Sequence, residues 1–319
     1  MKILAKTGRE DIAEVFIAEL QPGKLVELVE AVQPPQPREQ KWVLLISTMF
    51  GCPVKCKMCD AGGQYQGKLS RLEILEQIDY LVYRRYPDGS IPCQQFKIQL
   101  ARMGEPALNA AVLDVLDILP FRYRAPGLMP SLSTIAPHGA DAFFERLLEI
   151  KHQRYSGGAF QFQFSLHTTD AVLRDSLIPV KKWSFRQMAE YGERFYAPGD
   201  RKITLNFALA QGTPVDPEIL LHYFDPARYL VKITPLNPTY RARENQLDSY
   251  VDIHGAPGEY PVVDALRLAG YQVIVSIGAV EESSIGSNCG QYIRRHLAAE
   301  EPLGEGYTYA VHEFADPDM

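Results

Sequence analysis

Three cysteines in one short stretch are the residues of this sequence most clearly suited to chemistry. Their spacing is Cys52-x-x-x-Cys56-x-x-Cys59, and they follow an apolar run at residues 42–47 that predicts a β-strand. Three thiolates on one loop can bind three irons of a [4Fe–4S] cluster and leave the fourth iron without a protein ligand. A structural metal site is normally closed by protein ligands, so an open position indicates catalysis.

A zinc site or a disulfide framework explains these cysteines less well. The first histidine of the chain is His138, so no histidine lies near the cysteines in sequence to complete a zinc site. The chain has five cysteines in all, and an odd number with three of them so close together does not fit a disulfide framework. The other two, Cys93 and Cys289, lie far along the chain.

The elements that must position these residues alternate between short apolar strands and helical patterns. Six such βα units predict a parallel sheet with right-handed crossovers. Six units fall short of a closed eight-unit barrel, so we expect an α/β fold with a six-unit partial (β/α) barrel. A doubly wound sheet is the alternative. The predicted strands lie at residues 42–47, 96–100, 129–133, 160–166, 202–208 and 229–235. The predicted helices lie at residues 71–84, 110–119, 140–150, 185–195, 218–224 and 262–269.

Further elements are predicted at both ends of this array. Residues 13–19 and 24–31 predict a short N-terminal β-hairpin, and residues 272–277 and 288–298 predict a C-terminal extra strand and helix. We therefore expect three parts: a hairpin and linker (1–40), the partial barrel (41–270) and a C-terminal segment that carries Cys289 (271–319).

Composition and charge restrict the class of protein. The 319 residues are 46% hydrophobic and 23% charged, which is ordinary for a globular chain. The net charge of −6 provides no general attraction for nucleic acid or anionic lipid. No apolar run approaches the roughly 18 residues of a membrane span, and the N-terminus has no apolar secretory segment. We therefore expect a cytoplasmic protein without a membrane partner.

The cysteine motif Cys52-Pro-Val-Lys-Cys56-Lys-Met-Cys59 resembles the signature of radical S-adenosylmethionine (SAM) enzymes. In that superfamily the open iron binds the amino and carboxylate groups of SAM. One electron from the cluster then cleaves SAM to methionine and a 5′-deoxyadenosyl radical. The superfamily fold is a six-unit partial barrel, which agrees with the number of predicted βα units. The resemblance also implies an electron donor such as flavodoxin or ferredoxin.

Five later motifs narrow the resemblance, because they occur in order and mostly at predicted strand ends. Together they resemble the radical SAM adenine methyltransferases of ribosomal and transfer RNA, a family that includes an antibiotic-resistance methyltransferase. The motifs are Met103-Gly104-Glu105-Pro106, Leu132-Ser133-Thr134, Phe164-Ser165-Leu166-His167, Thr234-Pro235-Leu236-Asn237-Pro238 and Asn288-Cys289-Gly290-Gln291.

This resemblance implies a set of SAM-binding residues, with the Glu105 carboxylate on the amino group of SAM. The full set is Gly104, Glu105, Ser133, Ser165, Leu166, His167 and Asn237. Each also has an ordinary structural interpretation. Gly104 and Glu105 could form a turn and a helix cap, the serines and His167 could cap strand ends, and Asn237 could form a turn with Pro238.

The resemblance implies that Cys289 carries a methyl group. In the family this cysteine accepts a methyl from one SAM, and the radical from a second SAM activates that methyl for addition to an aromatic carbon. Such a thiol must be accessible and able to act as a nucleophile. The structural alternative is a small buried residue on a terminal helix.

The sequence departs from the family in ways that affect the substrate. Leu45 occupies the position of a second family cysteine that releases the methylated RNA. Only about forty residues precede the first barrel strand, in place of the family's N-terminal RNA-binding domain. Residues 271–319 contain two arginines against eight carboxylates, which would repel a polyanion. We therefore expect methylation of an unreactive carbon in a small molecule or peptide, with structured RNA unlikely. Direct hydrogen abstraction from a metabolite or peptide and RNA adenine methylation are the alternatives.

Overall fold

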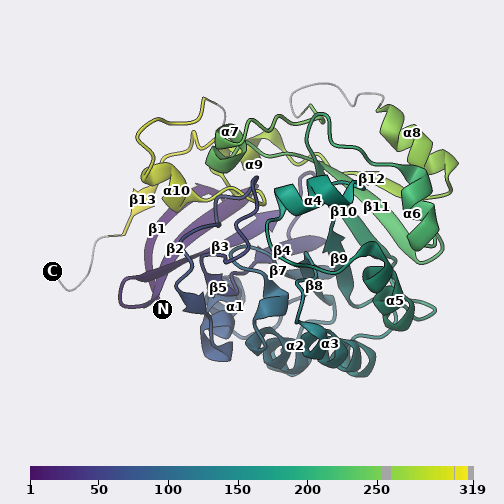
Figure 1. The fold of residues 1–319 in the computed structure, drawn as a ribbon. Coiled ribbons are helices and arrows are strands. Elements are labelled where there is room, and N and C mark those ends of the chain that lie inside the picture. The colour runs from purple at the N-terminus through teal and green to yellow at the C-terminus, as the bar shows by residue number, and fades with distance from the viewer. Residues whose placement is uncertain (253–259, 305, 315–319) are drawn as a thin grey trace.

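A single eleven-stranded mixed sheet organises the chain, and helices flank it (Figure 1). This computed structural model describes residues 1–252, 260–304 and 306–314. The strand order in the sheet is β12-β11-β10-β9-β8-β7-β4-β3-β2-β1-β13. Two short strands, β5 (Met49–Phe50) and β6 (Gly67–Lys68), form a separate antiparallel pair. The protein is therefore a mixed α/β protein, as the sequence predicts.

Seven strands of the sheet are parallel and lie side by side in chain order. They are β4 (Lys41–Leu45), β7 (Gln95–Leu100), β8 (Leu128–Thr134), β9 (Gln161–Ser165), β10 (Ile203–Leu209), β11 (Tyr229–Pro235) and β12 (Val273–Val275). The longer connecting helices are α1 (Arg71–Arg85), α2 (Ala111–Arg122), α3 (Asp141–Arg154), α5 (Phe185–Phe195), α6 (Pro217–Tyr223) and α8 (Pro261–Leu268). Each strand and helix of the six predicted units is present within a few residues of its expected position.

Local sequence signals explain where several helices begin. Ser70 accepts a hydrogen bond from Glu73 N, and the Glu73 side chain accepts one from Ser70 N, which completes a capping box at the start of α1. Ser184 and Gln187 form the same arrangement at the start of α5. These caps satisfy amide groups that the first helical turn would otherwise leave unpaired.

The N-terminal strands extend the same sheet in antiparallel fashion. The predicted hairpin is present as β2 (Ala13–Gln21) and β3 (Lys24–Val32), and β3 pairs with β4. A further strand that the sequence analysis did not identify, β1 (Lys2–Arg9), pairs with β2 and with β13 (His312–Glu313). Charged residues near both ends of β1 leave only a short run in which apolar and polar residues alternate. The sequence pattern therefore did not predict this strand.

The prediction of a helix over residues 288–298 is wrong in its first half. Only α10 (Ile293–Leu297) is helical there, because Gly290 has a φ of +87° that a right-handed helix excludes. The structure also adds three short helices, α4 (Ala171–Leu177), α7 (Tyr240–Glu244) and α9 (Val280–Ile285). One or two turns are too short for helical periodicity to be visible in the sequence.

The two faces of the parallel sheet differ in character. One face carries large buried side chains such as Trp42, Phe96 and Phe164, which pack in the main core with the helices. Figure 1 shows α1, α2, α3 and α5 together on one side of the sheet, and α4, α7, α9 and α10 on the opposite side of the view. The other face carries polar side chains, among them Lys97 and Lys232. In the described part of the chain, no helix has the length and apolar character needed to span a membrane.

Candidate active site

The three cysteines of the predicted cluster site lie on the loop between β5 and β6. Cys52, Cys56 and Cys59 are free thiols, and each is half-buried. The loop folds back on itself, since Cys59 N donates to Cys56 O at 3.3 Å and Gly63 N donates to Cys52 O at 3.4 Å. The structure therefore gathers the three thiols in one compact loop that follows the first parallel strand.

The segment after β11 holds this cysteine loop in place. The Thr239 hydroxyl donates to Met58 O at 3.1 Å, and Arg241 Nε donates to Cys56 O at 3.0 Å. The Asp60 carboxylate accepts from Tyr240 N and Arg241 N at 3.1 and 2.9 Å, at the start of α7. Sequence reasoning did not identify Thr239, Asp60 or Arg241 as residues that hold this loop. An Asp beside the third cysteine and a Thr ahead of a short helix are weak capping signals.

Cys289 lies on a neighbouring loop that contacts the cysteine loop directly. Asp60 N donates to Gly290 O at 2.9 Å, and Asn237 Nδ2 donates to Cys289 O at 2.9 Å. A Cβ on Gly290 would lie 3.1 Å from Met58 O, so the close approach of the two loops favours glycine there. Desolvation by the surrounding protein raises the pKa of the Cys289 thiol, but the residue itself is exposed. It is therefore an accessible thiol rather than the buried helical residue of the structural alternative.

A buried arginine fixes the loop that carries Cys289. Arg102 donates to the carbonyl oxygens of Gly286, Ser287 and Asn288 at 3.0 to 3.1 Å. Its guanidinium forms an ion pair with Glu27 of β3 at 2.7 Å, and both side chains are almost fully buried. The N-terminal strands thus take part in positioning the Cys289 loop, a role that the sequence did not reveal.

The chemistry of the four thiols fits an iron–sulfur cluster. Burial raises the pKa of Cys52 to about 11 and raises the pKa values of Cys56 and Cys59 further. Mutual repulsion adds to this effect, and Cys289 contributes to it at Cys56 and Cys59. Thiolates so placed need a bound cation to be stable. Within the described residues, no three His, Cys, Asp or Glu side chains converge on one metal ion. A cubane distributes its ligands over several irons, so three separated thiols fit it better than they fit a single ion.

Glu105 is a buried carboxylate with no cationic partner in the described part of the chain. It accepts hydrogen bonds from Ile135 N and Ala107 N at 3.1 and 3.0 Å and from the Thr134 hydroxyl. Burial raises its pKa to about 7. The preceding Gly104 has a φ of +100°, and a Cβ there would lie 2.7 Å from the Met49 side chain. The turn and the cap of the structural alternative are thus both present, and the carboxylate interacts electrostatically with Cys52 and Cys56.

Ser133 and Ser165 lie on the polar face of the sheet near the ends of β8 and β9. Both are half-buried, and within the described residues neither hydroxyl has a hydrogen-bond partner. They do not cap strand ends, so their hydroxyls can bind a ligand. Leu166 differs, because its side chain is fully buried in the main core. Only the backbone of Leu166 can contact a cofactor, and its amide already donates to Asn206 O at 2.9 Å.

His167 follows β9 in a left-handed backbone conformation, with a φ of 67°. Its Nδ1 accepts a hydrogen bond from Ala208 N at 3.1 Å, which leaves the proton of the neutral ring on Nε2. Burial, together with a smaller effect of the Arg174 charge, lowers the pKa of His167 to about 4. The imidazole is therefore neutral at pH 7 and presents one N–H donor.

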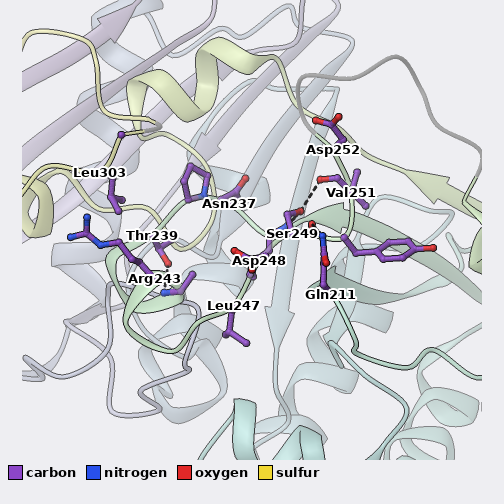
Figure 2. A pocket seen from close by; sticks show the side chains of 15 residues that line it. Gln211, Asn237, Thr239, Arg243, Leu247, Asp248, Ser249, Val251, Asp252 and Leu303 are labelled. Carbon is purple, nitrogen blue, oxygen red and sulfur yellow. Dashed lines mark hydrogen bonds between the residues drawn. The ribbon is translucent and has the colours of Figure 1, made fainter.

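Asn237 lies at the rim of a cavity of about 620 Å³ beyond the ends of β10 and β11 (Figure 2). This volume is within the range of small-molecule sites. Ser249 stabilises the wall by donating to Val251 O at 2.8 Å and accepting from Leu236 N at 3.0 Å. The turn with Pro238 is not the whole role of Asn237, because its amide also anchors the Cys289 loop.

The fifth cysteine lies away from the other four. Cys93 is buried in the main core ahead of β7, where its sulfur lies 3.5 Å from the Tyr86 hydroxyl. Leu45 is the last residue of β4 and packs against apolar neighbours. In the described chain, the only other cysteines near Cys289 are therefore the three on the cysteine loop.

The fold and the site form an α/β protein with a three-cysteine loop that follows the first parallel strand, an arrangement that resembles that of radical SAM enzymes. Among curated proteins, the chain is similar to a probable dual-specificity RNA methyltransferase RlmN from Synechococcus. The two are 26% identical over 268 residues, which cover 81% of this chain and 71% of the relative. The corresponding protein of Thermus thermophilus is 26% identical over 306 residues, covering 93% and 79% of the two chains. No family model matches the chain.

Among solved structures, a radical SAM methyltransferase from Sphaerobacter thermophilus has the same fold. Its TM-score is 0.66 at 20% identity, with 91% of this chain and 81% of that chain covered. These comparisons confirm the resemblance to radical SAM RNA adenine methyltransferases and the expectation of an enzyme. Radical SAM methyltransferases use a [4Fe–4S] cluster and SAM, which agrees with the predicted cofactors.

Proposed function

We propose that this protein is a radical SAM methyltransferase in which Cys289 carries the methyl group. The contact between the two loops carries the proposal: Gly290 O accepts from Asp60 N, directly beside Cys59, and the Cys289 thiol is exposed. An accessible thiol next to a cluster site can accept a methyl group and present it to a second molecule. We infer that the parallel strands form the partial barrel of this class, with residues 1–40 and 271–319 as flanking parts.

The proposed cofactors have matching groups in the chain. Cys52, Cys56 and Cys59 would bind a [4Fe–4S] cluster, which supplies the electron that cleaves SAM. The Glu105 carboxylate, which has no cationic partner in the described chain, would bind the amino group of SAM. An electron donor such as flavodoxin or ferredoxin would reduce the cluster.

The remaining proposed SAM-binding residues surround the same strand ends. The free hydroxyls of Ser133 and Ser165 and the Nε2–H of His167 can donate to the ribose and carboxylate oxygens. Asn237 keeps its side-chain oxygen for a ligand while its amide holds the Cys289 loop. Gly104 and Leu166 would contribute backbone only.

A small molecule or peptide is the substrate that the charge distribution favours. Residues 271–319, which include the Cys289 loop, have a local balance of −6. Arg241 and Arg243 are two basic residues close together in sequence, and both donate to backbone carbonyl oxygens. Arg241 donates to Cys56 O and Lys55 O, and Arg243 donates to Pro302 O and Glu301 O. An RNA backbone would find little positive charge on these elements.

RNA adenine methylation is the second candidate, because both curated relatives are named as RNA methyltransferases. Salt-dependent binding decides between the two candidates. Submicromolar affinity for ribosomal RNA fragments, with a steep loss of affinity as salt rises, would favour RNA. Weak and non-specific binding would favour the small substrate.

The proposed reaction is tested by incubating the reconstituted protein with deuterated-methyl SAM, a reductant and cell extract. Methyl transfer yields S-adenosylhomocysteine and a deuterated product, whereas direct hydrogen abstraction yields 5′-deoxyadenosine without S-adenosylhomocysteine. The matched variant is Cys289→Ala, which leaves the cysteine loop unchanged. It should lose both S-adenosylhomocysteine and the deuterated product, and it should still cleave SAM to 5′-deoxyadenosine.

A further inference from the structure

Two lysines on the polar face of the parallel sheet form no ion pair within the described part of the chain. Lys97 lies on β7 between Gln95 and Gln99, and only 9% of it is exposed. Lys232 lies on β11 and is half-buried. Within the described residues, neither amino group forms a hydrogen bond or an ion pair. A buried cation without a partner is costly, so such a group indicates a missing anion.

The two lysines lie on the same polar face of the sheet, on strands that are four positions apart. Strands β7 and β11 are separated by β8, β9 and β10. In a flat sheet this separation would be about 19 Å, at about 4.8 Å per strand, and the charges would be largely screened. Lys232 nevertheless lowers the pKa of Lys97 by repulsion. This repulsion agrees with a sheet whose polar face is concave between β7 and β11.

In the described part of the chain, the charged groups that shift the pKa of Lys97 are all cationic. Lys41 of β4 and Arg201, ahead of β10, add to the repulsion at Lys97. Lys41 donates to the Gln33 side chain, and Arg201 donates to Gly158 O, so neither is neutralised by a carboxylate there. Lys232 interacts electrostatically with Glu282 and Cys289, but no ion pair forms with Glu282 in the described structure. The interior of the curved face is thus a positive site next to the Cys289 loop.

We infer that Lys97 and Lys232 bind an oxyanion of the acceptor substrate, a carboxylate or a phosphate, on this face of the sheet. The identification of the bound anion as substrate rests on the proposed function; the anion site itself does not. Lys232 lies close enough to Cys289 to affect its pKa, so an anion held here would place the rest of the molecule near the thiol. Within the described residues, the amide side chains of Gln99, Gln163 and Asn206 on the same face form no hydrogen bond, so they can also donate to an anion bound there.

The site is tested by lysine footprinting of the full-length, reconstituted protein. Acetylation of each lysine by a water-soluble ester is followed by mass spectrometry at constant ionic strength, with inorganic phosphate, with succinate, or with chloride alone. The rate at Lys97 should fall about tenfold at a ligand concentration ten times its dissociation constant, because protection follows 1 + [L]/Kd. Protection by phosphate, by succinate or by both identifies the anion class. The exposed Lys181 should react equally in all three solutions.

Matched variants distinguish this site from the SAM site. Lys232→Gln should weaken anion protection of Lys97, and Lys181→Gln should leave it unchanged. Equal reactivity of Lys97 in phosphate, succinate and chloride would overturn the inference, and so would protection of Lys97 by SAM alone. If anions protect Lys97 but deuterated methyl is never transferred, the anion site stands and the proposed function fails. If methyl is transferred but no anion protects Lys97, the proposed function stands and the anion site fails.

Discussion

Replacing Lys97 by methionine should stabilise the protein, and the gain should depend on pH. Burial and the surrounding cations lower the pKa of Lys97 from its ordinary 10.5 to about 7. The unfolded chain therefore binds more protons than the folded chain between these two pH values, and the stability of the folded state rises with pH there. The cost of a protonated Lys97 is present in full below pH 7 and is lost as the pH approaches 10.5.

The size of this effect follows from the two pKa values. Linkage gives a cost of about 4 kcal/mol at pH 7 and about 2 kcal/mol at pH 9, since each pH unit corresponds to about 1.4 kcal/mol. Methionine keeps most of the length of the side chain and removes the charge, so Lys97→Met should recover most of that cost. Burial is the largest cause of the lowered pKa, and the basic groups that add to it are Lys232, Lys41 and Arg201, all of which remain in the variant.

The assay is urea unfolding of the full-length protein at pH 7 and pH 9, with exposed Lys181→Met as the control. We expect Lys97→Met to raise the free energy of unfolding at both values, and by about 2 kcal/mol more at pH 7 than at pH 9. The free energy of unfolding of the Lys181→Met control should stay within about 0.5 kcal/mol of that of the parent protein. An equal gain at both pH values, or no gain, would refute the assignment of Lys97 as an unpaired buried cation.

Three further predictions concern the residues around the cluster site. Cys56→Ala should lower the iron content of the anaerobically reconstituted protein and abolish SAM cleavage, as measured by iron analysis and 5′-deoxyadenosine formation; full iron content would contradict the assignment. Glu105→Gln should weaken SAM binding about tenfold to a hundredfold in calorimetry, the 1.5–3 kcal/mol of a charged hydrogen bond, while the Glu76→Gln control on the exposed face of α1 should not. Glu27→Gln should cost about 3 kcal/mol or more in unfolding, because it leaves Arg102 buried without its ion-pair partner; an unchanged midpoint would show that the pair does not hold the Cys289 loop.

The order of the parallel strands was predictable because each carries its own signal. Buried apolar runs, such as residues 229–235, alternate with amphipathic helices that begin at capping boxes, such as the one at Ser184. The loop of Cys52, Cys56 and Cys59 was predictable for the same reason, since its spacing is local. These features depend on residues that are close in sequence.

What the sequence could not show depends on contacts between distant residues. The pairing of Glu27 with Arg102 joins residues 75 positions apart, and it fixes a loop near position 289. The sequence analysis wrongly predicted that Cys289 lies on a helix. The spacing of apolar residues fits a helix there, but it does not show that Gly290 adopts a left-handed backbone conformation. The unpaired state of Lys97 is visible only when its neighbours on other strands are known. In sequence, a lysine in a strand usually indicates a solvated edge.

The central claim is that the Cys289 thiol carries the methyl group beside the cluster. Its most direct test is the mass of the peptide containing Cys289 after the reconstituted protein reacts with deuterated-methyl SAM and reductant. We expect a deuterated methyl group in place of the thiol hydrogen on Cys289 and on no other cysteine, and we expect Cys289→Ala to cleave SAM without this adduct. An unmodified Cys289 peptide, together with a variant that still methylates substrate, would contradict the account.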